Sequence, residues 1–104
     1  MTTFDYIVVG GGTAGCVVAA RLSQDPGCRV LLLEAGAARG PAEVSDPAGW
    51  LGLWGTSVDW DYRTVPQAAT EDAVHSWPRG RVLGGSSAIN GLAHVRGDRS
   101  SYDA

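Results

Sequence analysis

The sequence predicts an α/β fold with a parallel sheet, on the basis of three consecutive segments near its N-terminus. Residues 4–9 and 29–34 are short apolar runs, and residues 13–23 between them form a longer segment of small apolar residues. A strand, a helix and a strand within about 30 residues form one βαβ unit, in which the two strands lie parallel. This unit, residues 1–36, is the most regular part of the chain.

The two expected strands and the expected helix each have a local cause. Residues 4–9 are rich in β-branched and aromatic side chains and end at a glycine cluster, which is typical of a buried strand. Residues 13–23 have the length and small apolar side chains of a helix packed on a sheet, and the Asp-Pro-Gly sequence at residues 25–27 ends it. Residues 29–34 form a continuous apolar run, so we expect a strand covered on both faces.

Residues 37–76 are expected to form an irregular connecting or lid segment, because glycine, proline and tryptophan interrupt every pattern there. Within it, residues 58–65 alternate like an exposed strand before Pro66 ends the pattern. Trp50 and Trp54 are four residues apart and would share one face of a short helix. We expect the tryptophans of the chain to pack in a core or lid, and the alternative is that they line a substrate channel.

Residues 77–104 form the third part of the chain. A glycine turn at Gly84 and Gly85 and two serines lead into a short helix expected from Ala88. The last four residues offer no helix cap, no final strand and no apolar closure. We therefore expect an incomplete domain, with a separate substrate domain absent from these residues.

Composition and charge exclude several classes of protein. Apolar residues make up 44% and charged residues 18%, as in an ordinary folded domain. A net charge of −3 without any lysine provides no basic patch for nucleic acid. No apolar stretch is long enough for a membrane span or a signal peptide, so a cytoplasmic protein is expected. Cys16 and Cys28 lack the spacing of a disulfide framework or a metal site, and we expect reduced structural thiols.

Glycine accounts for 15 of 104 residues, about twice the usual share, and part of this excess forms a G-x-G-x-x-G motif. Between a strand and a helix, such a turn lets a pyrophosphate approach the backbone at the helix N-terminus. An acidic residue at the end of the next strand would bind the hydroxyls of an adenosine ribose and repel a 2′-phosphate. The motif predicts a Rossmann-like site for FAD or NAD rather than NADP, and an ordinary glycine turn is the alternative. The candidate binding residues of this unit are Gly10, Gly12, Thr13, Ala14, Gly15, Glu34 and Ala35.

A second motif occupies residues 79–91 and reads Arg-Gly-Arg-Val-Leu-Gly-Gly-Ser-Ser-Ala-Ile-Asn-Gly. Its glycine turn again offers backbone amides to a ligand. Together with residues 4–34, this motif closely resembles the glucose–methanol–choline (GMC) family of flavin oxidoreductases. Residues 59–67, 96–97 and 102–103 are similar to other segments of that family, so the resemblance covers essentially the whole chain.

The resemblance implies an FAD-dependent oxidoreductase that acts on the CH–OH group of an alcohol, with hydride transfer to flavin N5. It also implies that an extended flavin-covering segment follows the βαβ unit. Some family members carry the flavin covalently on a histidine, and the matching position here is Ile89, so non-covalent FAD is expected. The candidate flavin-contacting residues of the second part are Val82, Gly85, Asn90, Gly91, Leu92 and Ala93.

The resemblance places the catalytic residues outside this chain. The family's base histidine and its partner lie near the C-terminus, and neither His75 nor His94 matches them. The small-molecule alcohol would therefore be bound by the remaining part of a longer protein. The alternatives are a non-catalytic nucleotide-binding fragment and a small NAD-binding module. Arg79 and Arg81 have two open roles, neutralising the cofactor pyrophosphate or pairing with carboxylates elsewhere.

Overall fold

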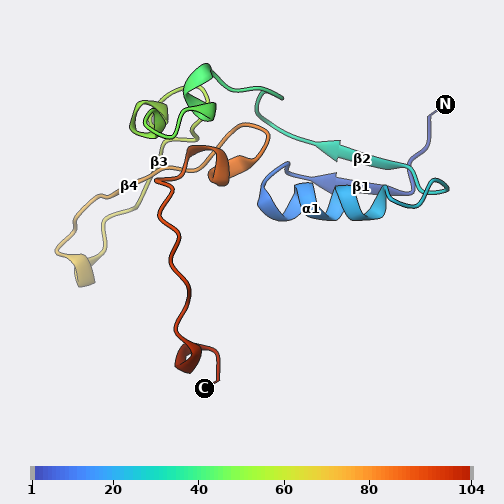
Figure 1. The fold of residues 1–104 in the computed structure, drawn as a ribbon. Coiled ribbons are helices and arrows are strands. Elements are labelled where there is room, and N and C mark those ends of the chain that lie inside the picture. The colour runs from blue at the N-terminus through green and yellow to red at the C-terminus, as the bar shows by residue number, and fades with distance from the viewer. Residues whose placement is uncertain (1, 104) are drawn as a thin grey trace.

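The computed structural model describes residues 2–103 and begins with the predicted βαβ unit (Figure 1). Strand β1 covers Tyr6–Val9, helix α1 covers Thr13–Leu22, and strand β2 covers Val30–Leu33. The two strands pair in parallel, from Tyr6 opposite Val30 to Val9 opposite Leu33. The α/β prediction is confirmed, and each expected element is one or two residues shorter at its ends.

The sheet of this unit is covered less than the sequence predicts. Helix α1 runs along one side of β1 and β2 (Figure 1). Ile7 and Val9 are nevertheless 60% and 81% exposed, and Leu33 at the end of β2 is exposed as well. Within β2 itself, residues 30–32 are half-buried, so among the described residues the strand expected to be covered on both faces is covered only in part. The physical reason is that a two-stranded sheet with one helix keeps an open face and two free edges.

After β2 the chain forms short elements. Strands β3, Tyr62–Arg63, and β4, Ser76–Trp77, pair antiparallel. The strand expected over residues 58–65 is thus reduced to two residues, because Val58 and Asp59 are buried beneath a turn and Asp61 has a positive φ of 47°. Between and around these strands lie five 3-10 helices, namely Ala42–Ser45, Trp50–Leu53, Ala68–Thr70, Gly85–Ile89 and Arg99–Ser101.

The helix expected from Ala88 starts earlier than predicted. It is a 3-10 helix that begins at Gly85 and ends at Ile89. Gly84 precedes it with a φ of 100°, a left-handed conformation that glycine adopts without strain. Beyond this helix the chain extends away from the rest of the molecule (Figure 1).

The hydrophobic core lies outside the βαβ unit. It consists of Leu53, Val58, Val82 and Ile89, and Val44 and Ala88 pack against it. Its members come from the connecting segment and from the second motif. The connecting segment, which has the least regular sequence pattern, therefore supplies two of the four buried apolar side chains among residues 2–103.

The tryptophans contribute little to this core. Trp54, Trp60 and Trp77 are 42%, 42% and 51% exposed, so the expectation of core packing is wrong for these three. Trp50 and Trp54 do contact each other edge to face, with ring centroids 5.0 Å apart, although the 3-10 helix ends at Leu53. Trp54 also donates a hydrogen bond from Nε1 to the Ile89 carbonyl at 3.1 Å, which ties it to the end of the second motif.

Two further properties concern residues 2–103 as a whole. None of their helices has both the length and the apolar character needed to cross a membrane. No group of three or more metal-ligating side chains within this range is arranged to hold a metal ion. Cys16 and Cys28 are free and half-buried, and Cys16 donates from Sγ to the Gly11 carbonyl at 3.1 Å.

Candidate functional site

The glycine turn between β1 and α1 is shaped for the close approach of a ligand. Gly10 has a φ of 97°, which permits the sharp turn off the strand. A Cβ on Gly15 would collide with the Gly10 carbonyl oxygen, so the helix can pack this closely on the turn only with glycine. The residue that precedes α1 is Gly12, which has no side chain to cap the helix, and the first turn holds no acidic residue. The positive end of the helix dipole is thus left for an anion.

Glu34 joins this turn to the end of β2. Its Oε2 accepts a hydrogen bond from the Gly11 N–H at 2.6 Å, and its Oε1 accepts one from the Gly36 N–H at 2.8 Å. A carboxylate oxygen can accept more than one hydrogen bond, so both oxygens can still receive ribose hydroxyls. The structure therefore gives Glu34 a second task that the sequence did not reveal, which is to fix the shape of the glycine turn.

The second motif lies directly on the first. Gly84 donates from its N–H to the Gly11 carbonyl at 2.7 Å, and Gly84 and Gly12 form a parallel bridge. A Cβ on Gly85 would lie 2.8 Å from the Gly12 Cα, closer than side chains come in real proteins. The two motifs therefore meet backbone to backbone, and residues far apart in the sequence form one site.

The two serines of the second motif stabilise this turn through hydrogen bonds to backbone groups of the same motif. Ser86 accepts at Oγ a hydrogen bond from the Gly80 N–H at 3.1 Å. Ser87 donates from Oγ to the Gly84 carbonyl at 2.6 Å. Neither serine caps the helix N-terminus, because the preceding residue is Gly84 and it carries no side chain.

A cavity of about 540 Å³ opens where the two motifs meet. This volume lies in the usual range for a site that binds a small molecule or cofactor. Five predicted site residues line it, and the structure thus brings together Gly10, Gly12, Glu34, Ala35 and Gly85. The remaining lining residues, which the sequence reasoning missed as site residues, are Val9, Leu33, Trp60, Gly80 and Ser86.

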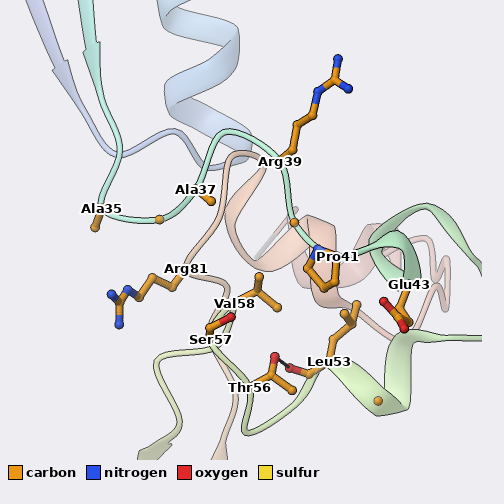
Figure 2. A pocket seen from close by; sticks show the side chains of 13 residues that line it. Ala35, Ala37, Arg39, Pro41, Glu43, Leu53, Thr56, Ser57, Val58 and Arg81 are labelled. Atoms are coloured by element: carbon orange, nitrogen blue, oxygen red, sulfur yellow. Dashed lines mark hydrogen bonds between the residues drawn. The ribbon is translucent and has the colours of Figure 1, made fainter.

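A second cavity, of about 680 Å³, shares Ala35 with the first and lies between the segment after β2 and residues 52–58 (Figure 2). Arg39 and Arg81 extend away from each other at its two sides (Figure 2). Thr56 lines this cavity, and its Oγ1 donates a hydrogen bond to the Leu53 carbonyl at 2.7 Å. Apart from Ala35, none of its lining residues is a predicted site residue.

Some predicted residues lie outside these two cavities, although Asn90 and Leu92 line a smaller one of about 90 Å³. Val82 is only 1% exposed and packs in the hydrophobic core, and it lines neither cavity. Asn90 and Leu92 form a local turn, in which Asn90 Oδ1 accepts from the Leu92 N–H at 2.8 Å. The segment from Asn90 to Ala93, with Gly91, is exposed at the start of the extended C-terminal stretch. Thr13 and Ala14 form the exposed first turn of α1.

Two further glycines position the site, Gly36 after β2 and Gly80 within the second motif. A Cβ on Gly36 would collide with the Arg81 carbonyl, and a Cβ on Gly80 would collide with the Gly85 carbonyl. The chain can therefore run this close to itself only with glycine at both positions. The signal for Gly80 is its place in the second motif, and the signal for Gly36 is the high glycine content, which the two motifs account for only in part.

The two arginines of the second motif lie over aromatic rings. The guanidinium carbon of Arg79 lies 4.8 Å from the Trp77 ring centroid, and that of Arg81 lies 5.1 Å from the Trp60 ring centroid. Such contacts stabilise an exposed cation by about 0.5–1 kcal/mol. Because Trp60 lines the first cavity and Arg81 lines the second, this pair lies between the two.

Asp59 is a buried carboxylate beside the site and is 5% exposed. Burial acts to raise its pKa, but hydrogen bonds from backbone N–H groups outweigh this effect and hold the pKa below its ordinary value. The side chain is thus ionised at neutral pH. The backbone donors that bond to its carboxylate belong to Gly55, Asp61 and Arg79.

The fold and the site together define a dinucleotide-binding protein of the Rossmann-like class, because the glycine turn, the open helix N-terminus and the strand-end carboxylate occur in one βαβ unit. The chain belongs to the GMC oxidoreductase family, whose sequence pattern matches residues 4–104. The resemblance seen in the two motifs is thereby confirmed.

Three similar proteins illustrate this membership. Glucose dehydrogenase [FAD, quinone] of Drosophila melanogaster is 45% identical, over 96% of this chain and 16% of its own length. Alcohol dehydrogenase [acceptor] of Pseudomonas putida is 45% identical, over 97% of this chain and 18% of its own length. The crystal structure of pyridoxine 4-oxidase from Mesorbium loti superposes with a TM-score of 0.89 at 48% identity, over 97% of this chain and 20% of that one. The chain thus spans about a fifth of the length of its relatives.

Proteins of the GMC family bind FAD, and the residues present fit the ADP part of that cofactor. A Cβ added to Gly12 would meet only the Gly85 Cα, at 4.0 Å, so Gly12 leaves room for a ligand, and the N-terminus of α1 carries no competing acid. Glu34 supplies acceptors for hydroxyl donors beside them. The donor set therefore suits a ribose and a pyrophosphate in neighbouring positions.

Proposed function

We propose that this chain is the cofactor-binding N-terminal part of an FAD-dependent oxidoreductase that oxidises the CH–OH group of an alcohol, and that it holds FAD without a covalent bond. The observation that carries this proposal is the meeting of Gly12, Gly85 and Glu34 around one cavity. When bound, the flavin would supply the hydride acceptor. The chain's own residues bind and orient the cofactor.

The individual contacts follow from the geometry. The open N-terminus of α1 and the side-chain-free surface of Gly12 suit the pyrophosphate. Glu34 suits the adenosine ribose, and its charge disfavours a 2′-phosphate there. Ala35 continues from Glu34 into the second cavity, which offers space beside the ribose site.

The choice of an alcohol donor is supported by the relatives rather than by any residue here. Similar proteins carry the names glucose dehydrogenase and alcohol dehydrogenase. His75 and His94 are both exposed, and neither lines the two cavities. We therefore propose that the substrate is a small-molecule alcohol bound by parts of the full-length protein beyond this chain, which also provide the catalytic base.

Titration of the full-length apoprotein with FAD, followed by quenching of flavin fluorescence, tests cofactor binding. We expect saturable binding of FAD, and NAD should not compete at similar concentrations. Tight NAD binding without FAD binding would instead favour a small NAD-binding module. Absence of binding to both would overturn the proposed dinucleotide site.

The absence of a covalent bond is tested separately. Ile89 has no nucleophilic atom and its side chain is buried in the core. Acid precipitation of the holoprotein should therefore release the yellow flavin into the supernatant. Colour retained in the washed pellet would contradict non-covalent binding. Reduction of the bound flavin by a panel of alcohols, measured by bleaching of its visible absorption, tests the donor class.

A further inference from the structure

Asp59 is the only buried charged side chain among residues 2–103, and its hydrogen bonds join two separate segments. Its Oδ2 accepts from the Gly55 N–H at 2.9 Å, and its Oδ1 accepts from the Asp61 N–H at 3.0 Å. The same Oδ1 accepts from the Arg79 N–H at 2.8 Å, across to the start of the second motif. One carboxylate thus fixes both its own turn and the entry of the second motif.

The backbone around Asp59 strengthens this connection. Asp59 and Gly80 form an antiparallel bridge. On one side of it the Trp60 N–H donates to the Arg79 carbonyl at 2.8 Å, and on the other the Arg81 N–H donates to the Val58 carbonyl at 2.7 Å. Residues 58–60 and 79–81 therefore form a short ladder, and the Asp59 carboxylate lies at its side.

This ladder leads to the cofactor cavity through two contacts between glycines. Gly80 packs so closely on the Gly85 carbonyl that a Cβ would collide with it. Gly85 packs in turn on the Gly12 Cα. Asp59 does not line the cavity, whereas its bridge partner Gly80 and its neighbour Trp60 do. A shift of residues 79–80 would therefore move one wall of the cavity.

We propose that Asp59 is a positioning residue of the dinucleotide site. By anchoring residues 79–80, it holds Gly80 against Gly85 and Gly85 against Gly12, and so fixes the position of these three glycines, which line the cavity proposed for the cofactor. This inference rests on the proposed function, because it concerns the same cavity. It adds a residue that touches neither the cavity nor the ligand and acts through Gly80.

The replacement Asp59→Asn tests this role in the full-length protein. The carboxamide keeps one acceptor oxygen but turns an NH₂ group toward a backbone N–H, so at least one of the three anchors is lost. The matched control is Asp61→Asn, which removes the same charge at a site two residues along the chain. Asp61 is exposed, and asparagine tolerates its positive φ. The measurement is the dissociation constant for FAD, taken well below the unfolding temperature of each variant.

We expect Asp59→Asn to weaken FAD binding about tenfold or more, since hydrogen bonds to a charged group are the strong ones. Asp61→Asn should bind within about twofold of the wild type. Gly80→Ala should weaken binding as well, and the double variant should lose less than the product of the two single effects, because both changes act on one contact.

Several outcomes would overturn the inference. Unchanged FAD affinity in folded Asp59→Asn, with a lowered melting temperature alone, would show that Asp59 stabilises the fold without setting the cavity. If the double variant Asp59→Asn with Gly80→Ala loses FAD affinity by the full product of the two single effects, the two residues do not act on one contact, and the inference is again overturned. If near-UV circular dichroism shows that Asp59→Asn does not fold, Gly80→Ala decides the question. Wild-type FAD affinity in Gly80→Ala would overturn the proposal that Asp59 acts on the cavity through Gly80 and Gly85, and a weakened affinity would support it. Failure of the wild type itself to bind FAD would overturn the proposed function instead.

Discussion

The Glu34 carboxylate accepts a hydrogen bond from the Gly11 N–H at 2.6 Å, and its other oxygen accepts one from the Gly36 N–H at 2.8 Å. Glu34 therefore stabilises the glycine turn itself, in addition to any ligand bound there. This dual role means that a change at Glu34 affects both the shape of the site and its recognition of a ribose.

The replacement Glu34→Gln tests whether Glu34 both stabilises the glycine turn and contributes to cofactor binding. The carboxamide nitrogen would oppose a backbone N–H, so we expect weaker FAD binding by about tenfold or more and a loss of about 1–3 kcal/mol in the free energy of unfolding. Fluorescence quenching and urea unfolding measure the two effects. Glu71→Gln, which removes the same charge from an exposed turn, is the control. Wild-type affinity in Glu34→Gln would remove Glu34 from the site.

The replacement Gly15→Ala tests the close packing of α1 on the glycine turn. The added Cβ would collide with the Gly10 carbonyl, which belongs to the backbone and cannot move aside cheaply. We expect a loss of about 1–3 kcal/mol in the free energy of unfolding, the usual cost of overpacking, together with weaker FAD binding. Gly52→Ala is the matched control, because a Cβ there meets no atom within 4 Å. Similar stability of the two variants would contradict the proposed packing.

Stability should depend on pH through Asp59. Burial acts to raise the pKa of this carboxyl, but hydrogen bonds from the backbone N–H groups of Gly55, Asp61 and Arg79 outweigh it, so the folded-state pKa lies below the unfolded one. The ionised side chain therefore stabilises the fold above the ordinary aspartate pKa of about 3.9, and this stabilisation is lost as pH falls through the lower folded-state value.

A comparison of wild type with Asp59→Asn at several pH values checks this dependence. The difference in the free energy of unfolding should be about 1.5–3 kcal/mol near pH 7 and should shrink as the solution is acidified below about pH 4. Denaturant titrations measure it. A difference that stays constant down to the lowest accessible pH would show that the charge of Asp59 does not contribute.

The 104-residue chain on its own should bind FAD weakly. Its βαβ unit leaves Ile7 and Val9 largely exposed, and its sheet has free edges. We expect no saturation at FAD concentrations that saturate the full-length protein, and strong binding of a hydrophobic dye to the open sheet face. A cooperative thermal transition together with tight FAD binding by the isolated chain would contradict this prediction.

The parts of the fold that could be predicted from the sequence depend on local pattern. The βαβ unit follows from two apolar runs and one small-residue helix, and the cradle follows from the spacing of Gly10, Gly12 and Gly15. The second motif could be recognised only through its family resemblance, because a glycine pair before two serines has no distinctive local structure.

The rest depends on contacts between distant segments, which a local pattern does not encode. Asp59 looks like an ordinary polar residue in an alternating strand until its partner Arg79 is placed beside it. Val82 is predicted to face the flavin, yet its side chain fills the core because the segment lies between Ala37 and Val58. The exposure of the tryptophans has a related cause. The aromatic content of a segment does not determine which other residues its side chains pack against.

The contact between Gly12 and Gly84 also constrains how the site can assemble during protein synthesis. The glycine turn leaves the ribosome first, but the residues that complete it follow 72 positions later. At a translation rate of about 5–20 residues per second, this separation corresponds to roughly 4–14 seconds. Throughout that interval the nascent chain exposes an unfinished cradle and the free edges of β1 and β2, so FAD can stabilise the site only after the second motif has emerged.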